Sequence, residues 1–211
     1  MKKLLIIFIC LLSNQFSIAQ LNGYGLKGGV TLGNQYWNYQ TLDEANFQNF
    51  KLGYNGLIFL SFLNHNSISI ETELQFNQKG ASGTDLVFNQ DFESRINLVS
   101  LNAFLKIRKE SFSNSFYLLM GPKVEYLIGN SYPGINQNFN IEPVVAAGPG
   151  FEYFLNLEWA VSLEMLFNYA PLNFYKSDIY NISNRSIEFR VGIKKLLDPL
   201  KNFDRCPPVH L

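Results

Sequence analysis

The chain has 211 residues, of which 47% are hydrophobic, 15% aromatic and 16% charged, and its formal net charge is zero. This composition is richer in aromatic and poorer in charged residues than an ordinary soluble domain. The balanced charge excludes a basic nucleic-acid-binding surface and an acidic disordered tail. The length fits one large all-β domain or two small domains.

The first twenty residues, MKKLLIIFICLLSNQFSIAQ, have the order of a secretory signal peptide. Lys2 and Lys3 precede a short apolar stretch, and small residues precede a cleavage point after Ala19, so we expect a signal peptide at 1–19. Cleavage would leave Cys206 as the last cysteine, which excludes an internal disulfide. No later stretch reaches the roughly 18 apolar residues of a membrane helix, so any passage through a membrane would be made by strands.

After this segment, hydrophobic and polar residues alternate in eight stretches. Successive side chains of a strand point to opposite faces, so each stretch predicts a strand with one apolar and one polar face. Each reaches or slightly exceeds the 9–11 residues of a tilted membrane strand. The eight predicted strands cover residues 23–33, 51–63, 67–80, 95–108, 115–129, 143–155, 159–169 and 186–195.

The third stretch, SISIETELQFNQKG, shows the pattern most clearly. Ile68, Ile70, Leu74 and Phe76 occupy even positions, and the odd positions from residue 71 onward are all polar. A soluble sheet would turn the apolar face inward, whereas a membrane barrel would turn it toward lipid.

Long and short connections alternate between the predicted strands. The long ones are 34–50, 81–94, 130–142 and 170–184, and the short ones lie near 64–66, 109–114 and 156–158. Long outer loops and tight periplasmic turns are typical of outer-membrane barrels, and an even number of strands returns both termini to the periplasm.

The apolar faces carry no charge except Lys195 at the end of the last strand. A Lys or Arg on a lipid-facing position costs about 2–4 kcal/mol at mid-bilayer, and a soluble core would exclude the charged faces equally. We therefore predict an all-β, eight-stranded, antiparallel, transmembrane up-and-down barrel over 20–195, in the outer membrane of a Gram-negative bacterium. Its interior is narrow, so its charges should pair into a structural network. These lumen residues are Lys27, Glu71, Glu73, Lys79, Lys106, Arg108, Lys123, Glu125, Glu152, Glu164, Glu188, Arg190 and Lys194.

Two other classes of function stay open. A secreted, lipocalin-like barrel binding an apolar ligand would show the same alternation with its faces reversed. A barrel enzyme acting on lipid or protein would need a positioned His or Ser at the outer rim. The two histidines, His65 and His210, fall at the opposite end, and we find no catalytic residue, metal site or cofactor site in the sequence.

Outer-membrane lipid is the expected partner, with a protein or glycan as a further partner at the extracellular loops. In loop 34–50, Trp37 and Tyr39 are the candidate contacts, because aromatic rings bind such partners well. Pro122 and Pro149 fall inside predicted strands, where we expect a β-bulge at each. Residues 196–211 should form an irregular periplasmic tail.

The sequence resembles the porin-like outer-membrane β-barrel domain family of Bacteroidota, which includes PorT-like proteins. The resemblance covers roughly 21–195 and rests on YGLKGGVTLGN, ELQFNQKGA, LKI, LMGPKVEYLIG and SIEFRVGIKK. Members often have Pro where this chain has Asn102, and they tend to finish at the last strand. The resemblance implies a barrel scaffold with a non-enzymatic role in envelope structure, surface interaction, or secretion and transport. It assigns no catalytic residue.

Overall fold

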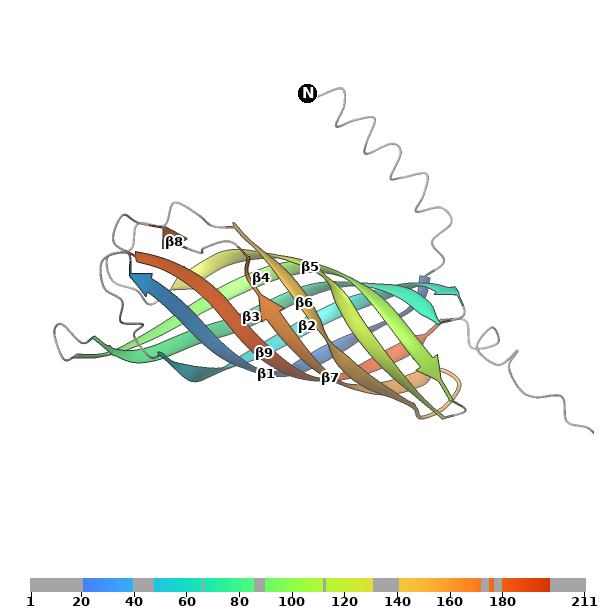
Figure 1. Cartoon of the computed structure of the whole chain (residues 1–211). Coiled ribbons are helices and arrows are strands. Elements are labelled where there is room, and N and C mark those ends of the chain that lie inside the picture. Colours follow the sequence, from blue (N-terminus) through green and yellow to red (C-terminus); the bar gives the residue numbers. More distant parts are fainter. Residues whose placement is uncertain are drawn as a thin grey trace, which may run out of the picture.

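The computed structural model describes residues 21–39, 48–65, 67–85, 90–111, 113–130, 141–171, 175–176 and 180–197. Eight long antiparallel strands form a closed barrel, and a two-residue strand, β8, is attached beside β9 (Figure 1). This confirms the predicted fold class. The strands are β1 (Leu21–Tyr39), β2 (Gln48–His65), β3 (Ile68–Asp85), β4 (Gln90–Glu110), β5 (Asn114–Asn130), β6 (Ile141–Phe154), β7 (Trp159–Tyr169), β8 (Tyr175–Lys176) and β9 (Tyr180–Leu196).

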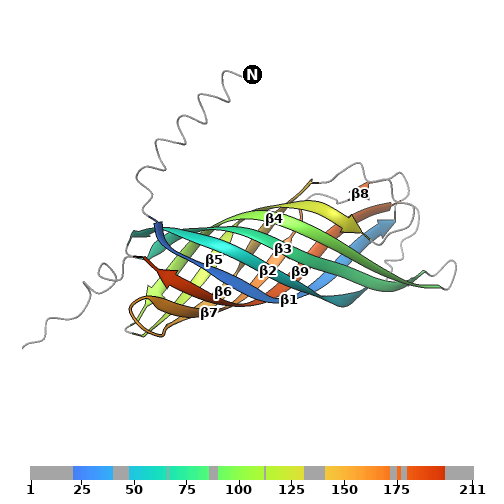
Figure 2. The ribbon, with the colours of Figure 1, turned by 180° about the vertical axis from the view of Figure 1, so that it is seen from behind.

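Pairing between the first and last strands closes the sheet. β1 pairs with β9 from Gly23 opposite Leu196 to Tyr39 opposite Tyr180, and every other long strand pairs with its neighbours in the chain. Figure 2 shows β1 lying between β2 and β9. Closure matters because an unpaired backbone edge cannot be hydrogen-bonded by water inside a bilayer.

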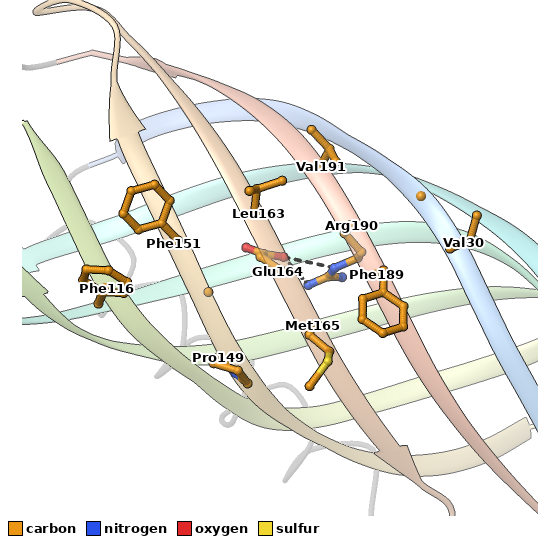
Figure 3. Close-up of a pocket in the computed structure, with 12 residues that line it drawn as sticks. Val30, Phe116, Pro149, Phe151, Leu163, Glu164, Met165, Phe189, Arg190 and Val191 are labelled. Atoms are coloured by element: carbon orange, nitrogen blue, oxygen red, sulfur yellow. Dashed lines mark hydrogen bonds and ion pairs between the residues drawn. The ribbon is translucent and has the colours of Figure 1, made fainter.

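The apolar faces point outward and the charged faces point inward. On β7, Leu163 and Met165 project from the outer side of the wall, whereas Glu164 between them turns inward toward Arg190 (Figure 3). The outward Leu101 is 66% exposed, whereas the inward Lys106 on the same strand is 1% exposed. This arrangement contradicts the lipocalin-like alternative, whose apolar face would line the interior. Within the described residues, no helix is long and apolar enough to cross a membrane.

Aromatic and basic residues mark the two ends of the outer apolar band. At the end with short turns, the Lys195 ammonium lies 5.8 Å from the Trp159 ring centroid. At the other end, the Arg185 guanidinium lies 5.6 Å from the Tyr169 ring centroid. Aromatic rings and basic side chains favour the membrane–water interface. The segment between Trp159 and Tyr169 therefore has the length expected of a membrane-crossing strand.

Several strands continue well beyond this band, which corrects the predicted loop boundaries. β4 begins at Gln90 and β3 ends at Asp85, so only 86–89 separate them, rather than 81–94. Trp37 and Tyr39 likewise belong to β1 and not to a loop. Outside the lipid neither face of a strand must be apolar, so the alternation that predicted the strands stops before the strands do.

The expected bulges at Pro122 and Pro149 are absent. The pairing register of β5 with β6 is continuous through both residues, with Pro122 opposite Val145 and Pro149 opposite Leu118. The pairing is interrupted instead on one side only, toward β4 at Pro122 and toward β7 at Pro149, and it resumes in the same register. A proline lacks one amide hydrogen, and each strand residue directs its amide toward one neighbour, so the other ladder is unaffected.

Candidate functional site in the barrel lumen

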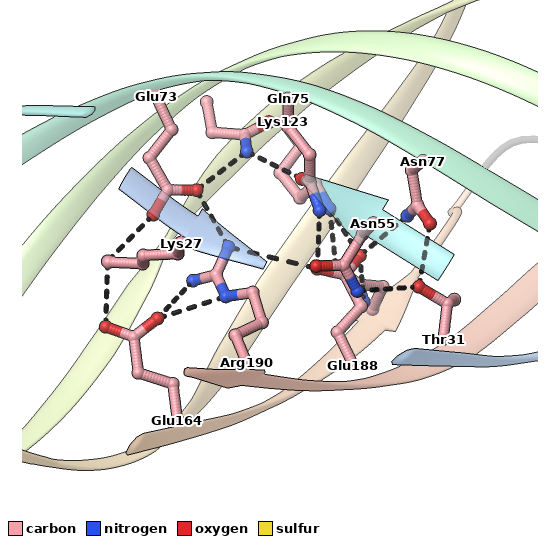
Figure 4. Close-up of polar contacts among 12 residues, drawn as sticks. Lys27, Thr31, Asn55, Glu73, Gln75, Asn77, Lys123, Glu164, Glu188 and Arg190 are labelled. Atoms are coloured by element: carbon pink, nitrogen blue, oxygen red, sulfur yellow. Dashed lines mark hydrogen bonds and ion pairs between the residues drawn. The ribbon is translucent and has the colours of Figure 1, made fainter. Parts of the chain in front are cut away.

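Charged side chains fill the interior of the barrel. The thirteen residues that the sequence assigns to the lumen are all buried, with no more than 5% of each exposed. They come from β1, β3, β4, β5, β6, β7 and β9, so the charges of almost the whole wall converge on one space. Figure 4 shows the central part of this space.

Two basic and two acidic residues form the centre of this space. Lys27 Nζ lies 2.8 Å from a carboxylate oxygen of Glu164 and 3.2 Å from one of Glu73. The Arg190 guanidinium reaches the same two carboxylates, at 2.9 Å from Glu73 and 2.7 Å from Glu164. Each central charge therefore has two partners of opposite sign.

Ion pairs continue from this centre toward the short-turn end. Lys27 also pairs with Glu71. Lys106 lies 3.8 Å from Glu71 and 3.5 Å from Glu152, and Lys194 lies 3.8 Å from Glu152. These contacts connect the centre with the residues nearest the turns.

Ion pairs also continue toward the long-loop end. Arg190 lies 3.9 Å from Glu188, which lies 2.8 Å from Lys123. Lys123 is 3.6 Å from Glu125, and Lys79 closes the series at 2.7 Å from Glu125.

Twelve of the thirteen residues thus form one connected network in which basic and acidic groups alternate. The thirteenth, Arg108, is buried and has an interaction of its own. Burial of an isolated charge here would be unfavourable, because the free-energy cost of its desolvation exceeds the stabilisation from a single poorly oriented ion pair. The alternating arrangement gives every member at least one charge of opposite sign within 4 Å.

Uncharged polar groups complete the hydrogen bonding of the carboxylates. Gln75 and Asn77 donate to Glu188 at 2.8 and 2.9 Å, and the Asn102 amide donates to Glu73 at 2.9 Å. The Tyr117 hydroxyl donates to Glu164 at 2.7 Å. These donors hold the carboxylates in place and lower the cost of their burial.

Carboxylates of the lumen lie close to basic side chains. Glu71, Glu73, Glu125 and Glu152 each lie within 4 Å of a Lys or Arg nitrogen. A general acid or base needs a proton that it can exchange with a substrate, and these groups are committed to neighbouring cations.

Sequence reasoning missed one acidic lumen residue, Glu142. It was assigned to a loop, but it lies near the start of β6, is 4% exposed and accepts a hydrogen bond of 2.8 Å from Asn184. With it, the buried charges of the described residues comprise seven basic and seven acidic groups. The signal was available, because Glu142 shares the even, inward-facing positions of Glu152.

The lumen also contains apolar side chains that the sequence left unassigned. Phe104 and Tyr117 pack with Leu119, Ala146 and Leu166 in one buried cluster. Phe104 lies between Asn102 and Lys106 on the inward face of β4, so alternation places it inside. Such residues fill volume that charged chains alone would leave empty.

Several predicted features lie outside the described residues. They are the signal peptide at 1–19 and most of the 196–211 tail, which contains Cys206 and His210. The side chains of Trp37, Tyr39 and His65 are also not described, although their backbones belong to β1 and β2.

Comparison with solved structures and protein families identifies relatives of this arrangement. OprG from Pseudomonas aeruginosa, an outer membrane protein, matches with a TM-score of 0.58 and 9% identity over 84% of this chain and 97% of that one. Ail, the attachment invasion locus protein of Yersinia pestis, matches with a TM-score of 0.42 and 11% identity over 83% and 99% of the two chains. At this level of identity the match to OprG shows a shared fold.

No curated protein matches the sequence significantly. Residues 4–194 match the family described as "Outer membrane protein beta-barrel domain". The matched segment covers the whole barrel as far as the inward-facing Lys194. This chain therefore belongs to the outer membrane protein β-barrel domain family.

Proposed function

We propose that this protein is a closed, non-conducting and non-enzymatic barrel that serves as a structural component of the outer membrane. The alternating network of twelve lumen charges carries this proposal, because it occupies the space through which a solute would pass. Barrels of eight strands are just wide enough for side chains to fill them, whereas open channels belong to larger barrels.

The proposal includes an orientation. The short turns after β2, β4 and β6, together with the end of the barrel that holds Leu21 and Leu197, face the periplasm. The longer connections face the cell exterior. The hydrogen bond of 3.0 Å from the Leu197 amide to the Asn22 carbonyl joins the first and last described segments at that end. Short periplasmic turns are the usual arrangement in such barrels.

Conductance across planar lipid bilayers tests the central claim. The wild-type barrel is expected to produce no stepwise current after insertion, because the lumen charges are paired and packed. The double variant K27A/R190A removes both central cations and is expected to admit a small leak. The matched double variant K51A/R95A removes two cations that pair with the exposed Glu93 and should stay silent. Stepwise currents from the wild type would refute the proposal.

A surface-interaction role is the second candidate, and the extended wall favours it. β3 and β4 pair from Gly80 opposite Arg95 out to Asp85 opposite Gln90, beyond the end of β5. This hairpin would project from the cell surface and present a protein or glycan partner with a rigid edge. Impermeant cross-linking on intact cells, with residues 82–93 replaced by a short turn, would abolish any specific adduct if the hairpin makes the contact.

The resemblance to PorT-like proteins supports a third candidate function, in which the barrel is an accessory component of a secretion or transport assembly in Bacteroidota. Co-purification of a fixed set of envelope proteins after mild solubilisation would support it. Recovery of the barrel alone would count against it.

A further inference from the structure

The outer wall carries an apolar groove of about 640 Å³ across five adjacent strands, β5, β6, β7, β9 and β1. Two rows of outward side chains border it (Figure 3). Neighbouring members of a row lie opposite one another in consecutive strand pairs, except at the interruption of the β6–β7 pairing at Pro149. The first row is Phe116, Phe151, Leu163 and Val191, and the second is Pro149, Met165, Phe189 and Val30.

Backbone forms the floor between the two rows. The floor contains Gly29 and Gly150, which have no side chain. It also contains Glu164 and Arg190, whose side chains point into the lumen. The groove is therefore apolar although the central ion pairs lie directly behind it. Four spacings between neighbouring strands give it a length of about 19 Å.

The groove runs obliquely along the wall rather than parallel to the membrane. Phe116, at one end, lies close to Asn114, where β5 begins beside a short turn. Val30, at the other end, lies midway along β1. The groove therefore rises from the short-turn end of the apolar band to its centre. A length of about 19 Å at an oblique angle fits within one leaflet of a hydrocarbon core about 30 Å thick.

A basic residue lies next to the short-turn end of the groove. Lys109 is exposed on the outer wall of β4, directly opposite Phe116 in the β4–β5 pair, so it extends the first row by one strand. The Phe116 and Phe151 rings lie 4.9 Å apart beside it and form an aromatic entrance. The groove is about as long as an acyl chain, and the ammonium-bearing Lys109 follows one end of it. This combination matches a phospholipid whose phosphate binds Lys109.

We propose that this groove binds one phospholipid of the periplasmic leaflet, with an acyl chain between the two rows and the phosphate at Lys109. This inference rests on the proposed orientation, which places the short turns in the periplasm. A glycolipid of the outer leaflet would enter from the opposite end, where the two rows finish at the apolar residues Val30 and Val191.

Native mass spectrometry of the barrel tests the site after gentle extraction from vesicles of phosphatidylethanolamine and phosphatidylglycerol. The wild type is expected to retain one phospholipid. M165W fills the groove and should lower retention about tenfold, as the loss of a few buried methylene contacts implies. K109Q leaves the groove open but removes the cation and should lower retention severalfold.

Matched controls separate this site from general lipid contact. L74W places the same bulk on the outer face of β3, away from the groove, and K195Q removes another outward lysine at the short-turn end. Both should retain phospholipid like the wild type, and a heat-dependent gel shift verifies that each variant is folded. Equal retention by M165W and L74W, or no retained phospholipid in the wild type, would overturn the inference.

Failure of the site can be distinguished from failure of the proposed function. Labelling of a cysteine introduced at Leu157, in a short turn, reports orientation on intact cells independently of lipid binding, and conductance reports closure. Preferential retention of an outer-leaflet glycolipid from native membranes would overturn the leaflet assignment while leaving the closed lumen untouched.

Discussion

At the scale of single residues, the protein depends on pairing each buried charge with an opposite one. Arg190 illustrates this, because its guanidinium is fully enclosed and reaches Glu73, Glu164 and Glu188. The alternation and the absence of charge on the other face predicted that these residues lie inside, over the reversed arrangement of a lipocalin-like barrel. It could not say which carboxylate each cation would meet, since Arg190 and Glu73, for example, lie 117 positions apart in the chain.

Replacement of Arg190 by alanine should lower the free energy of unfolding by about 3–5 kcal/mol, because it leaves three buried carboxylates with one cation fewer. Urea unfolding in lipid vesicles, followed by gel mobility, would measure this difference. R95A is the matched control, since Arg95 pairs with Glu93 while both side chains are more than half exposed, and it should cost less than about 1 kcal/mol. Similar losses for the two variants would show that the network contributes little to stability.

At the scale of the strands, glycines preceding the two prolines allow close approach to a neighbouring backbone. A Cβ on Gly148 would lie 1.8 Å from the Met165 carbonyl oxygen, and one on Gly121 would lie 2.0 Å from that of Ala103. The repeated Gly-Pro pair is visible in the sequence, but its consequence is not. Sequence reasoning expected an extra residue to bulge out, whereas each glycine permits a close approach to the neighbouring strand while the register is kept.

G148A should therefore destabilise the barrel by about 1–3 kcal/mol, because the added methyl group forces β6 away from β7. G56A is a matched control, since nothing lies within 4 Å of a Cβ built there. It should be neutral or slightly stabilising, by about 0.4–1 kcal/mol, as it restricts the unfolded chain. The same urea titration compares the two, and equal stability would contradict the close approach.

At the scale of the whole molecule, the barrel is turned inside out relative to a soluble protein. Large apolar side chains such as Leu101, Leu26 and Leu52 are mostly exposed on its outer wall, while Glu71, Lys123 and Glu188 are fully enclosed. The apolar side chains face lipid instead of a protein core, and the charged side chains face the lumen instead of water. In a soluble barrel the two faces would have to be exchanged.

This inversion predicts the effect of a new charge on the wall. L101R places a cation on the lipid-facing side of β4 and should cost about 2–4 kcal/mol, so that less protein folds into vesicles. L157R places the same residue in the short turn between β6 and β7, outside the apolar band, and should fold almost like the wild type. A gel assay of the heat-resistant fraction would compare them. Equal folding of both variants would argue against a lipid-covered wall.

The sequence by itself determined the class of this protein. Alternation of period two, balanced charge on one face and none on the other specify an eight-stranded barrel facing lipid, because each residue's side of the wall depends only on its position in its own strand. Tertiary structure decided the rest: the length of the strands beyond the membrane, the partners within the network and the oblique groove. These features depend on which residues of different strands come to lie opposite one another. That register is set by closure of the sheet and by side-chain packing across the lumen, which no single segment encodes.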